Sequence, residues 1–259
     1  MSNYVALKYY FNDELAIRLA NLIEHQHNNF PSDSFISSVE TGVEGKELKA
    51  RVEEIADKLY EHLPSEYTEA LSILLKILGP ENKTEEGMFT KGYFLMPVAK
   101  FVEKYGHNHF DLSLEALYEI TKRHTAEYAI RPYLRLDIDR CLEYLEKWRG
   151  DDNPHVRRLV SEGTRPRLPW AKKIEPVQND PVINLCLLKP MMNDPSPYVR
   201  KSVANHINDL SKDDPSAVIV WLEEYMQSHG IIDTKVVKHG LRTLIKTGNM
   251  EANRLLTSL

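Results

Sequence analysis

Residues 151–173, DDNPHVRRLVSEGTRPRLPWAKK, place six basic side chains that could bind an anion on both sides of one acid, Glu162. Asp-Asn-Pro is a favourable helix start, because Asn can cap the first turn and proline has no N–H to leave unsatisfied there. The helix would carry Glu162, and the loop after it is stiffened by two prolines. The basic residues of this stretch are Arg157, Arg158, Arg165, Arg167, Lys172 and Lys173. The pattern predicts an anion-binding surface with one carboxylate at its centre.

The charge distribution is compatible with a nucleic acid partner, although the formal net charge is −5. Residues 1–100 carry 10 Lys and Arg against 16 Asp and Glu, whereas the remainder carries 23 against 22. A phosphate backbone responds to the local field, which reaches about 8 Å in physiological salt. The basic clusters at 157–173 and 235–246 therefore count for more than the total charge.

Apolar residues recur at helical spacing along the chain, for example over 15–23, 48–59 and 114–120, and no stretch alternates like a strand. Residues 154–161, PHVRRLVS, resemble residues 197–204, PYVRKSVA, at an offset of 43, and 236–242 form a weaker third copy. A period of about 40–47 residues with paired helices is typical of HEAT and armadillo repeats. We predict an all-α, HEAT-like helical-repeat solenoid, C-shaped with a basic concave face.

We expect residues 1–259 to form a single repeat domain, with a more acidic helical part over 1–110 and the chemistry within 111–259. In the repeat register Glu162 corresponds to Asn205, so an acid replaces a neutral polar residue. If the second helix of each pair lines the concave side, one face gathers a row of cations. This row consists of Arg157, Arg158, Arg200, Lys201, Lys238 and Arg242.

Several function classes lack a signal. There is no phosphate-binding glycine loop and no dinucleotide fingerprint, and no serine or cysteine has a nucleophile's surroundings. The histidine pairs at 25/27 and 107/109 lie two residues apart, so we expect no metal site and no cofactor. No apolar run is long enough to span a membrane.

Cys141 and Cys186 lie in apolar helical stretches, which favours buried free thiols in a cytoplasmic protein. We expect a monomer.

Two runs carry a recognisable family signature. Residues 155–170, HVRRLVSEGTRPRLPW, and residues 125–132, TAEYAIRP, resemble the DNA alkylation repair glycosylases, specifically their AlkC branch. The resemblance implies a solenoid that grips duplex DNA and excises cationic alkylated bases, chiefly 3-methyladenine and also 3-methylcytosine, without full base flipping. Many relatives continue into an immunoglobulin-like domain, which we do not expect in residues 1–259.

The same resemblance implies the roles of individual residues. Glu127, Glu162 and Trp170 match the motifs that carry catalysis, and duplex DNA containing alkylated bases is the implied partner. The residues expected to hold DNA are Arg158, Arg165, Arg167, Lys172, Lys201, Lys238 and Arg242.

These residue types suit the chemistry. Alkylation at N3 makes the purine cationic, so its glycosidic bond is already weak and the base can depart neutral. What remains is to stabilise an oxocarbenium-like sugar and to orient a water, and a carboxylate can do both. An indole facing the charged base adds a cation–π interaction of about 0.5–2 kcal/mol.

Each residue also has a purely structural alternative. Glu162 could form a helix-face ion pair with Arg158, and Glu127 could stabilise the first turn of a helix capped by Thr125. Trp170 could pack between repeats, and the arginine after Val in a repeat often contacts the next repeat, so we expect Arg158 rather than Arg157 to bind DNA. At the level of the whole chain, the rivals are a non-catalytic DNA-binding member of the superfamily and a protein–protein scaffold.

Overall fold

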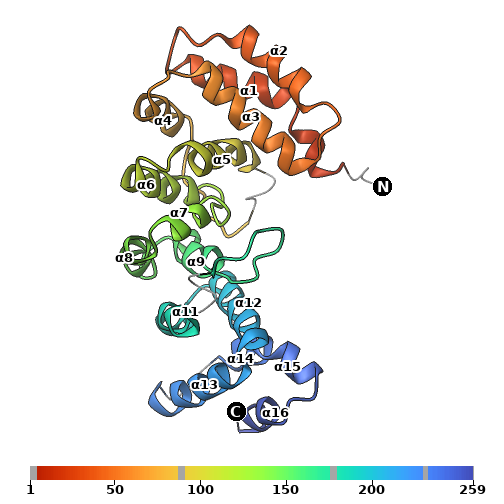
Figure 1. Cartoon of the computed structure of the whole chain (residues 1–259), viewed down its shortest axis with the longest axis vertical. Helices are drawn as coiled ribbons and strands as arrows, with labels where there is room; N and C mark the ends of the chain where they lie inside the picture. The colour runs from red at the N-terminus through yellow and green to blue at the C-terminus, as the bar shows by residue number, and fades with distance from the viewer. Residues whose placement is uncertain (1–4, 87–90, 176–179, 230–232, 259) are drawn as a thin grey trace. The chain divides into compact units, whose positions relative to one another are not determined.

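A computed structural model describes residues 5–86, 91–175, 180–229 and 233–258 of the chain. Every regular element in these ranges is a helix, which confirms the predicted all-α fold (Figure 1). Contacts divide the chain into two compact units, Met1–Ala129 and Ile130–Leu259. Helical repeats contact mainly their sequence neighbours, so contacts can group into units without a linker between them. The expected single repeat domain over residues 1–259, with a more acidic part over 1–110, stays a prediction.

In the described residues of the first unit, a short 3-10 helix is followed by six α-helices and a second 3-10 helix. Its elements are η1 (Leu7–Tyr10), α1 (Asp13–Glu24), α2 (Ser32–Val43), α3 (Leu48–His62), α4 (Tyr67–Lys76), η2 (Tyr93–Leu95), α5 (Met96–Tyr105) and α6 (Phe110–Thr121). The predicted helices at 15–23, 48–59 and 114–120 are confirmed as parts of α1, α3 and α6. Their apolar stripes form the core of the unit.

The second unit holds the two main repeat copies and the third. Its elements are α7 (Arg131–Leu136), α8 (Ile138–Trp148), α9 (Pro154–Gly163), α11 (Pro181–Leu188), η3 (Lys189–Met191), α12 (Pro197–Asp213), α13 (Pro215–His229), α14 (Thr234–Gly240), α15 (Arg242–Lys246) and α16 (Met250–Thr257). Helices α9, α12 and α14 pack side by side in one layer, and α8, α11 and α13 lie on the other side (Figure 1). This two-layer arrangement of helix pairs confirms the helical-repeat prediction.

The two main repeat copies start their helices in the same way. Asn153 caps α9 by accepting a hydrogen bond from the His155 amide, and Ser196 caps α12 by accepting one from the Val199 amide. Proline occupies the first helical position in both, where its missing N–H costs nothing. The sequence therefore determines where the helices of this layer begin.

Each repeat is tied to the next by an arginine that follows the valine. Arg157 donates to the Asp151 carbonyl of its own turn and to both carboxylate oxygens of Asp194, at 2.6 and 2.9 Å. Its equivalent, Arg200, donates to the Asp194 carbonyl and pairs with Asp233 at 2.8 Å. The expectation that Arg157 has a structural role between repeats is confirmed.

Helices α12 and α14 approach closely at Gly240. A Cβ atom at this position would lie 2.8 Å from Cγ2 of Ile207 and 3.1 Å from its Cβ. Ile207 is buried and branched at Cβ, so it has little freedom to move away. Gly240 therefore lets the third repeat copy dock against the second.

The two cysteines differ in environment. Cys141 of α8 is buried, as expected, but Cys186 of α11 is exposed, and both are free thiols. The expectation of burial was wrong for Cys186 because the one polar side chain within α11, Asn184, is itself buried, so the sequence of this helix does not show which face is covered. Among the described residues, no helix has the length and apolar character needed to cross a membrane.

Candidate active site

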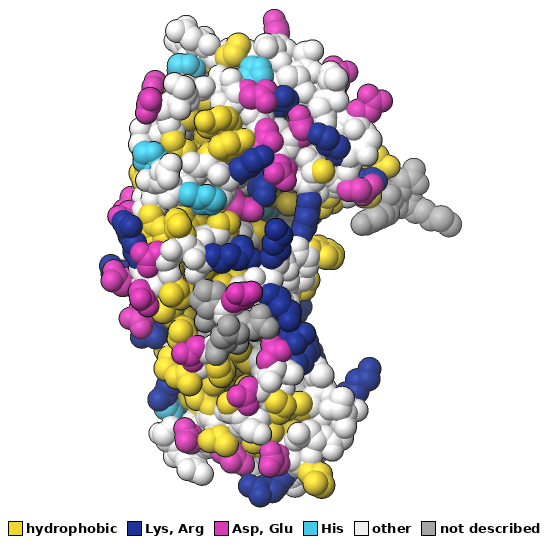
Figure 2. All heavy atoms as spheres, viewed as in Figure 1, with side chains coloured by type: hydrophobic (Ala, Val, Ile, Leu, Met, Phe, Trp, Pro, Cys, Tyr) yellow, Lys and Arg dark blue, Asp and Glu magenta, His cyan; other side chains and the backbone are white. Residues whose placement is uncertain are grey.

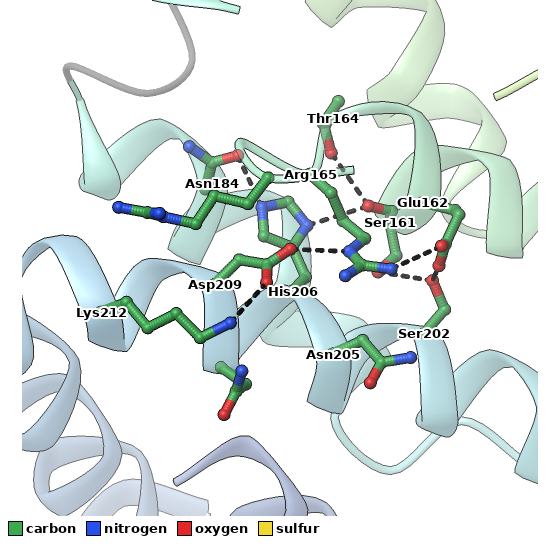
Figure 3. A network of polar contacts seen from close by, with 12 residues as sticks. Ser161, Glu162, Thr164, Arg165, Asn184, Ser202, Asn205, His206, Asp209 and Lys212 are labelled. Atoms are coloured by element: carbon green, nitrogen blue, oxygen red, sulfur yellow. Dashed lines mark hydrogen bonds and ion pairs between the residues drawn. The ribbon is translucent and has the colours of Figure 1, made fainter. Parts of the chain in front are cut away.

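Glu162 lies in the last turn of α9 as a buried carboxylate with both oxygens bonded. Its Oε1 accepts a hydrogen bond from Arg165 Nη1 at 2.7 Å and lies 3.8 Å from Arg158 Nη2. Its Oε2 accepts one from the Ser202 hydroxyl of α12 at 2.5 Å. Figure 3 shows these groups converging from two neighbouring helices and the loop after α9. The carboxylate is therefore held in one orientation.

The electrostatic surroundings keep Glu162 ionised. Burial by itself raises the pKa of this carboxyl, but the Arg158 and Arg165 guanidiniums and the Ser202 hydroxyl outweigh it and lower the pKa below its ordinary value. A carboxylate that stays charged at neutral pH inside the protein can stabilise a nearby cation strongly, since few waters screen it. The predicted helix-face pair with Arg158 exists, but it is one contact of a larger network.

Arg165 connects Glu162 to a second acid. Its Nε donates to Asp209 Oδ2 at 2.8 Å while Nη1 bonds Glu162, and Lys212 lies 3.4 Å from the other oxygen of Asp209 (Figure 3). Arg165 and Asp209 are both buried. Because a guanidinium presents its donors in a rigid fork, it fixes the two carboxylates relative to each other.

His206 of α12 contacts the turn of α9 that carries Glu162. It is fully buried, with Nδ1 2.9 Å from the Ser161 carbonyl and Nε2 2.9 Å from Asn184 Oδ1 (Figure 3). Burial, and next the Arg165 charge, lower the pKa of His206 to about 3. The ring is therefore neutral at physiological pH and positions the peptide next to Glu162.

Comparison with known proteins identifies the family. The model of the DNA alkylation repair enzyme family matches residues 44–235, more than half of the chain. The chain belongs to this family.

Two relatives of known sequence or structure support the same assignment. The uncharacterized protein YhaZ of Bacillus subtilis (strain 168) is 37% identical over 247 residues, which are 95% of this chain and 66% of that protein. A solved structure of the Pseudomonas fluorescens alkylpurine DNA glycosylase AlkC, bound to DNA containing an abasic site analog, matches with a TM-score of 0.85 and 33% identity. That match covers 97% of this chain and 68% of the AlkC chain. The chain thus spans about two thirds of the length of these relatives.

Two arginines of α7 anchor the loop after α9. The first of them, Arg131, also belongs to the TAEYAIRP segment. Arg131 is buried and donates to the carbonyls of Gly163 and Arg165, both at 2.9 Å, and to the Lys172 carbonyl at 2.7 Å. Arg135 donates to the Lys173 carbonyl at 3.1 Å. Backbone groups at both ends of the loop are therefore fixed by side chains of α7.

Trp170 lies on this anchored loop with its side chain turned outward. It is 82% exposed and has a backbone φ of 61°, the only non-glycine residue with positive φ among those described. This left-handed conformation costs a residue with a Cβ about 1 kcal/mol or more. Its exposure argues against the alternative that Trp170 packs between repeats, and its predicted contact with the base stays a prediction.

Glu127 lies in the first unit. The sequence suggested a position early in a helix, and the structure shows that this is wrong. Glu127 is buried and sits in a turn, and the next helix, α7, begins only at Arg131. The expected helix start at Thr125 was wrong because Pro132 occupies the second position of α7. Proline is favoured in the first turn of a helix, so it fits a helix that starts at Arg131 and not one that starts at Thr125. A role for Glu127 at a helix N-terminus is excluded, while its catalytic role stays a prediction.

The residues predicted to hold DNA differ in exposure. Arg167, Lys172, Lys201 and Lys238 are exposed, and Arg158 and Arg242 are half-buried. Arg165 is only 7% exposed and bonded to two carboxylates, so we reassign it from the DNA-binding surface to the support of Glu162. Arg167 pairs with Asp213 of α12. Figure 2 shows Lys and Arg side chains gathered near the loop after α9.

Ser202 and Asp209 are site residues that the sequence analysis missed. Both lie on α12, where Ser202 contacts Glu162 of α9 and Asp209 contacts Arg165 of the loop after α9. They share one helix face with His206, since positions 202, 206 and 209 recur at spacings of three and four. This spacing is visible in the sequence, but nothing in it shows which helix lies opposite. Among the described residues, His, Cys, Asp and Glu side chains form no group of three that could hold a metal ion.

Proposed function

We propose that this protein is a DNA glycosylase that excises cationic alkylated bases, 3-methyladenine first and 3-methylcytosine as a further substrate, from duplex DNA. The observation that carries the proposal is the buried, ionised Glu162, held by Arg158, Arg165 and Ser202. Membership of the DNA alkylation repair enzyme family and the likeness to AlkC bound to DNA support it.

Glu162 is suited to stabilise positive charge. Its pKa lies below the ordinary value, so it is a weak proton acceptor, and both its oxygens already accept hydrogen bonds. We assign it the electrostatic role: as the glycosidic bond breaks, the bonding electrons leave with the neutral base and the sugar becomes oxocarbenium-like. The fixed carboxylate stabilises that sugar without having to reorient. Water then adds to C1′ and releases a proton, which leaves an abasic site.

The exposed cations would hold the DNA. Lys172 and Arg167 lie on the same loop as Trp170, whose exposed indole would contact the charged base. The backbone of that loop is fixed by Arg131 and Arg135, so little conformational freedom is lost on binding. Glu127 of the first unit is the second candidate carboxylate and is tested separately.

The test is release of free 3-methyladenine from methylated duplex DNA, measured beside DNA affinity for each variant. We expect Glu162→Gln to lower the rate by about 100-fold or more while DNA affinity is retained. Glu251→Gln, an exposed acid of α16, is the matched control and should keep the wild-type rate. Glu127→Gln is run in parallel, and methylated cytosine-rich duplex tests the second substrate.

The outcomes distinguish the competing functions. No base release by a folded protein that binds DNA would leave a non-catalytic DNA-binding protein. No salt-dependent DNA binding at all would favour a protein–protein scaffold, because phosphate contacts make affinity fall steeply with salt.

A further inference from the structure

A second polar cluster lies one repeat beyond Glu162, between α12 and the helices α14 and α15. Asn205 Oδ1 accepts hydrogen bonds from His239 Nε2 at 2.9 Å and from Arg242 Nη2 at 3.1 Å. Arg242 Nη1 also donates to the His239 carbonyl at 2.6 Å. We call Asn205, His239, Arg242 and the neighbouring Lys201 the Asn205 cluster.

The contacts determine the tautomer of His239. A guanidinium can only donate, so the group of Asn205 that faces Arg242 is the oxygen and not the amide nitrogen. His239 Nε2 faces the same oxygen and must therefore carry a hydrogen. The basic nitrogen of the ring is Nδ1, which has no hydrogen-bond partner among the described residues.

The charges around His239 are predominantly positive. Arg242 of α15 and Lys201 of α12 both act on it, Lys238 is its neighbour on α14, and Arg165 and Asp209 act on Arg242 from further away. Burial and then the charges of Arg242 and Lys201 lower the pKa of His239 below its ordinary value. In the described part of the chain, Lys201, His239 and Arg242 form no ion pair with a carboxylate.

Alignment of the repeats shows that the Asn205 cluster has no carboxylate where the preceding repeat has Glu162. Asn205 occupies the position of Glu162, where a carboxylate balances the guanidiniums. A neutral amide stands here instead, beside side chains that are half-buried or exposed and within reach of a ligand. An anionic ligand would balance these cations as Glu162 balances Arg158 and Arg165.

We propose that the Asn205 cluster binds a phosphate group of the DNA backbone and that His239 Nδ1 takes up a proton from solvent when the phosphate binds. The phosphate would accept hydrogen bonds from Arg242, Lys201 and the imidazolium, and charge-assisted bonds of this kind are the strong ones. The inference rests on the DNA-binding part of the proposed function and is independent of base excision. It makes DNA affinity depend on pH through one identified residue.

The experiment measures the dissociation constant of an undamaged duplex by fluorescence anisotropy between pH 5.5 and 8.5 at constant ionic strength. Because one proton is taken up, wild-type affinity should rise as the pH falls, by at most about tenfold per pH unit. His239→Gln keeps a donor for Asn205 but cannot take up a proton, so it should lose most of this pH dependence. His229→Gln, an exposed histidine of α13, is the matched control and should keep it.

A second measurement follows the proton directly. The binding enthalpy, measured in buffers of different ionisation enthalpy, should reveal proton uptake for the wild type and for His229→Gln but not for His239→Gln. Inorganic phosphate at matched ionic strength shows whether a free ion alone is bound. If His239→Gln keeps the wild-type pH dependence and proton uptake, this inference is wrong while the glycosylase proposal stands. Absence of DNA binding at every pH would overturn both.

Discussion

The Glu162 cluster, which consists of Glu162, Arg158, Arg165, Ser202 and Asp209, and the Asn205 cluster are one arrangement used twice with opposite electrostatics. Glu162 and Asn205 occupy equivalent positions of the repeat, and each accepts a hydrogen bond from an arginine. Each also accepts one from the next helix of the layer, from Ser202 in the case of Glu162 and from His239 in the case of Asn205. With Glu162 the acceptor is charged and buried, and two carboxylates surround the arginine. With Asn205 it is neutral and the cations stay unbalanced.

The difference shows how a repeat protein can diversify a site. The repeat supplies the backbone geometry, the capped helix start and the inter-repeat contact, and exchange of one residue type at a fixed position reverses the sign of the local charge. A carboxylate suits a cationic base, whereas a neutral acceptor among cations suits a phosphate. Both proposals can be tested by treating the two clusters as a matched pair.

The largest contrast is expected from the two arginines. Arg165→Met leaves Glu162 and Asp209 buried without their shared cation, and we expect the free energy of unfolding to fall by about 3–5 kcal/mol. Arg242→Met removes a bond to a neutral, half-buried amide and should lower it by only about 1 kcal/mol. Urea unfolding followed by circular dichroism measures both. Equal losses would contradict the assignment of Arg165 to a buried supporting role.

A smaller contrast is expected from the two inter-repeat salt bridges. Asp194 has a side chain only 4% exposed and bonds both Arg157 and the Ser196 amide, so Asp194→Asn should lower the free energy of unfolding by about 2–3 kcal/mol. Asp233 is more exposed, and Asn can still cap α14, so Asp233→Asn should lower it by less than about 1 kcal/mol. The same unfolding measurement applies, and a reversed order would show that the third repeat copy is held more tightly than its exposure indicates.

The smallest expected effect concerns the ionisation of Glu162. Ser202→Ala removes a hydroxyl that lowers the pKa of Glu162, so the pKa of this carboxyl should rise. In the proposed function the carboxylate is the active form, so base release by Ser202→Ala should decline at a higher pH than that of the wild type as the solution is acidified. Ser161→Ala, one step further along the hydroxyl chain at 3.1 Å, should have a smaller effect.

Titration of the Glu162 carboxyl by carbon NMR measures this shift without relying on activity. Glu162→Gln assigns the signal, because the resonance is lost in that variant. An unchanged pKa in Ser202→Ala would show that the arginines alone keep Glu162 ionised.

Much of the second unit was predictable because local signals agreed with the tertiary structure. The Asn153-Pro154 and Ser196-Pro197 starts, the offset of 43 residues and the correspondence of Glu162 with Asn205 all follow from the sequence. Where local signals were weak, prediction failed. Cys186 lies on a helix without a polar face, and the turn containing Glu127 carries residues that are equally compatible with a helix.

The sequence by itself determined the helices, the repeat period, the family signature and the acid among arginines, because spacing and residue type act locally. Tertiary structure decided that Arg165 is buried between two acids and that Ser202 and Asp209 belong to the site. It also decided that Trp170 faces outward on a loop anchored by Arg131. The reason is physical: burial and the pairing of charges depend on which helix faces which, and contacts between residues some 40 positions apart leave no local pattern.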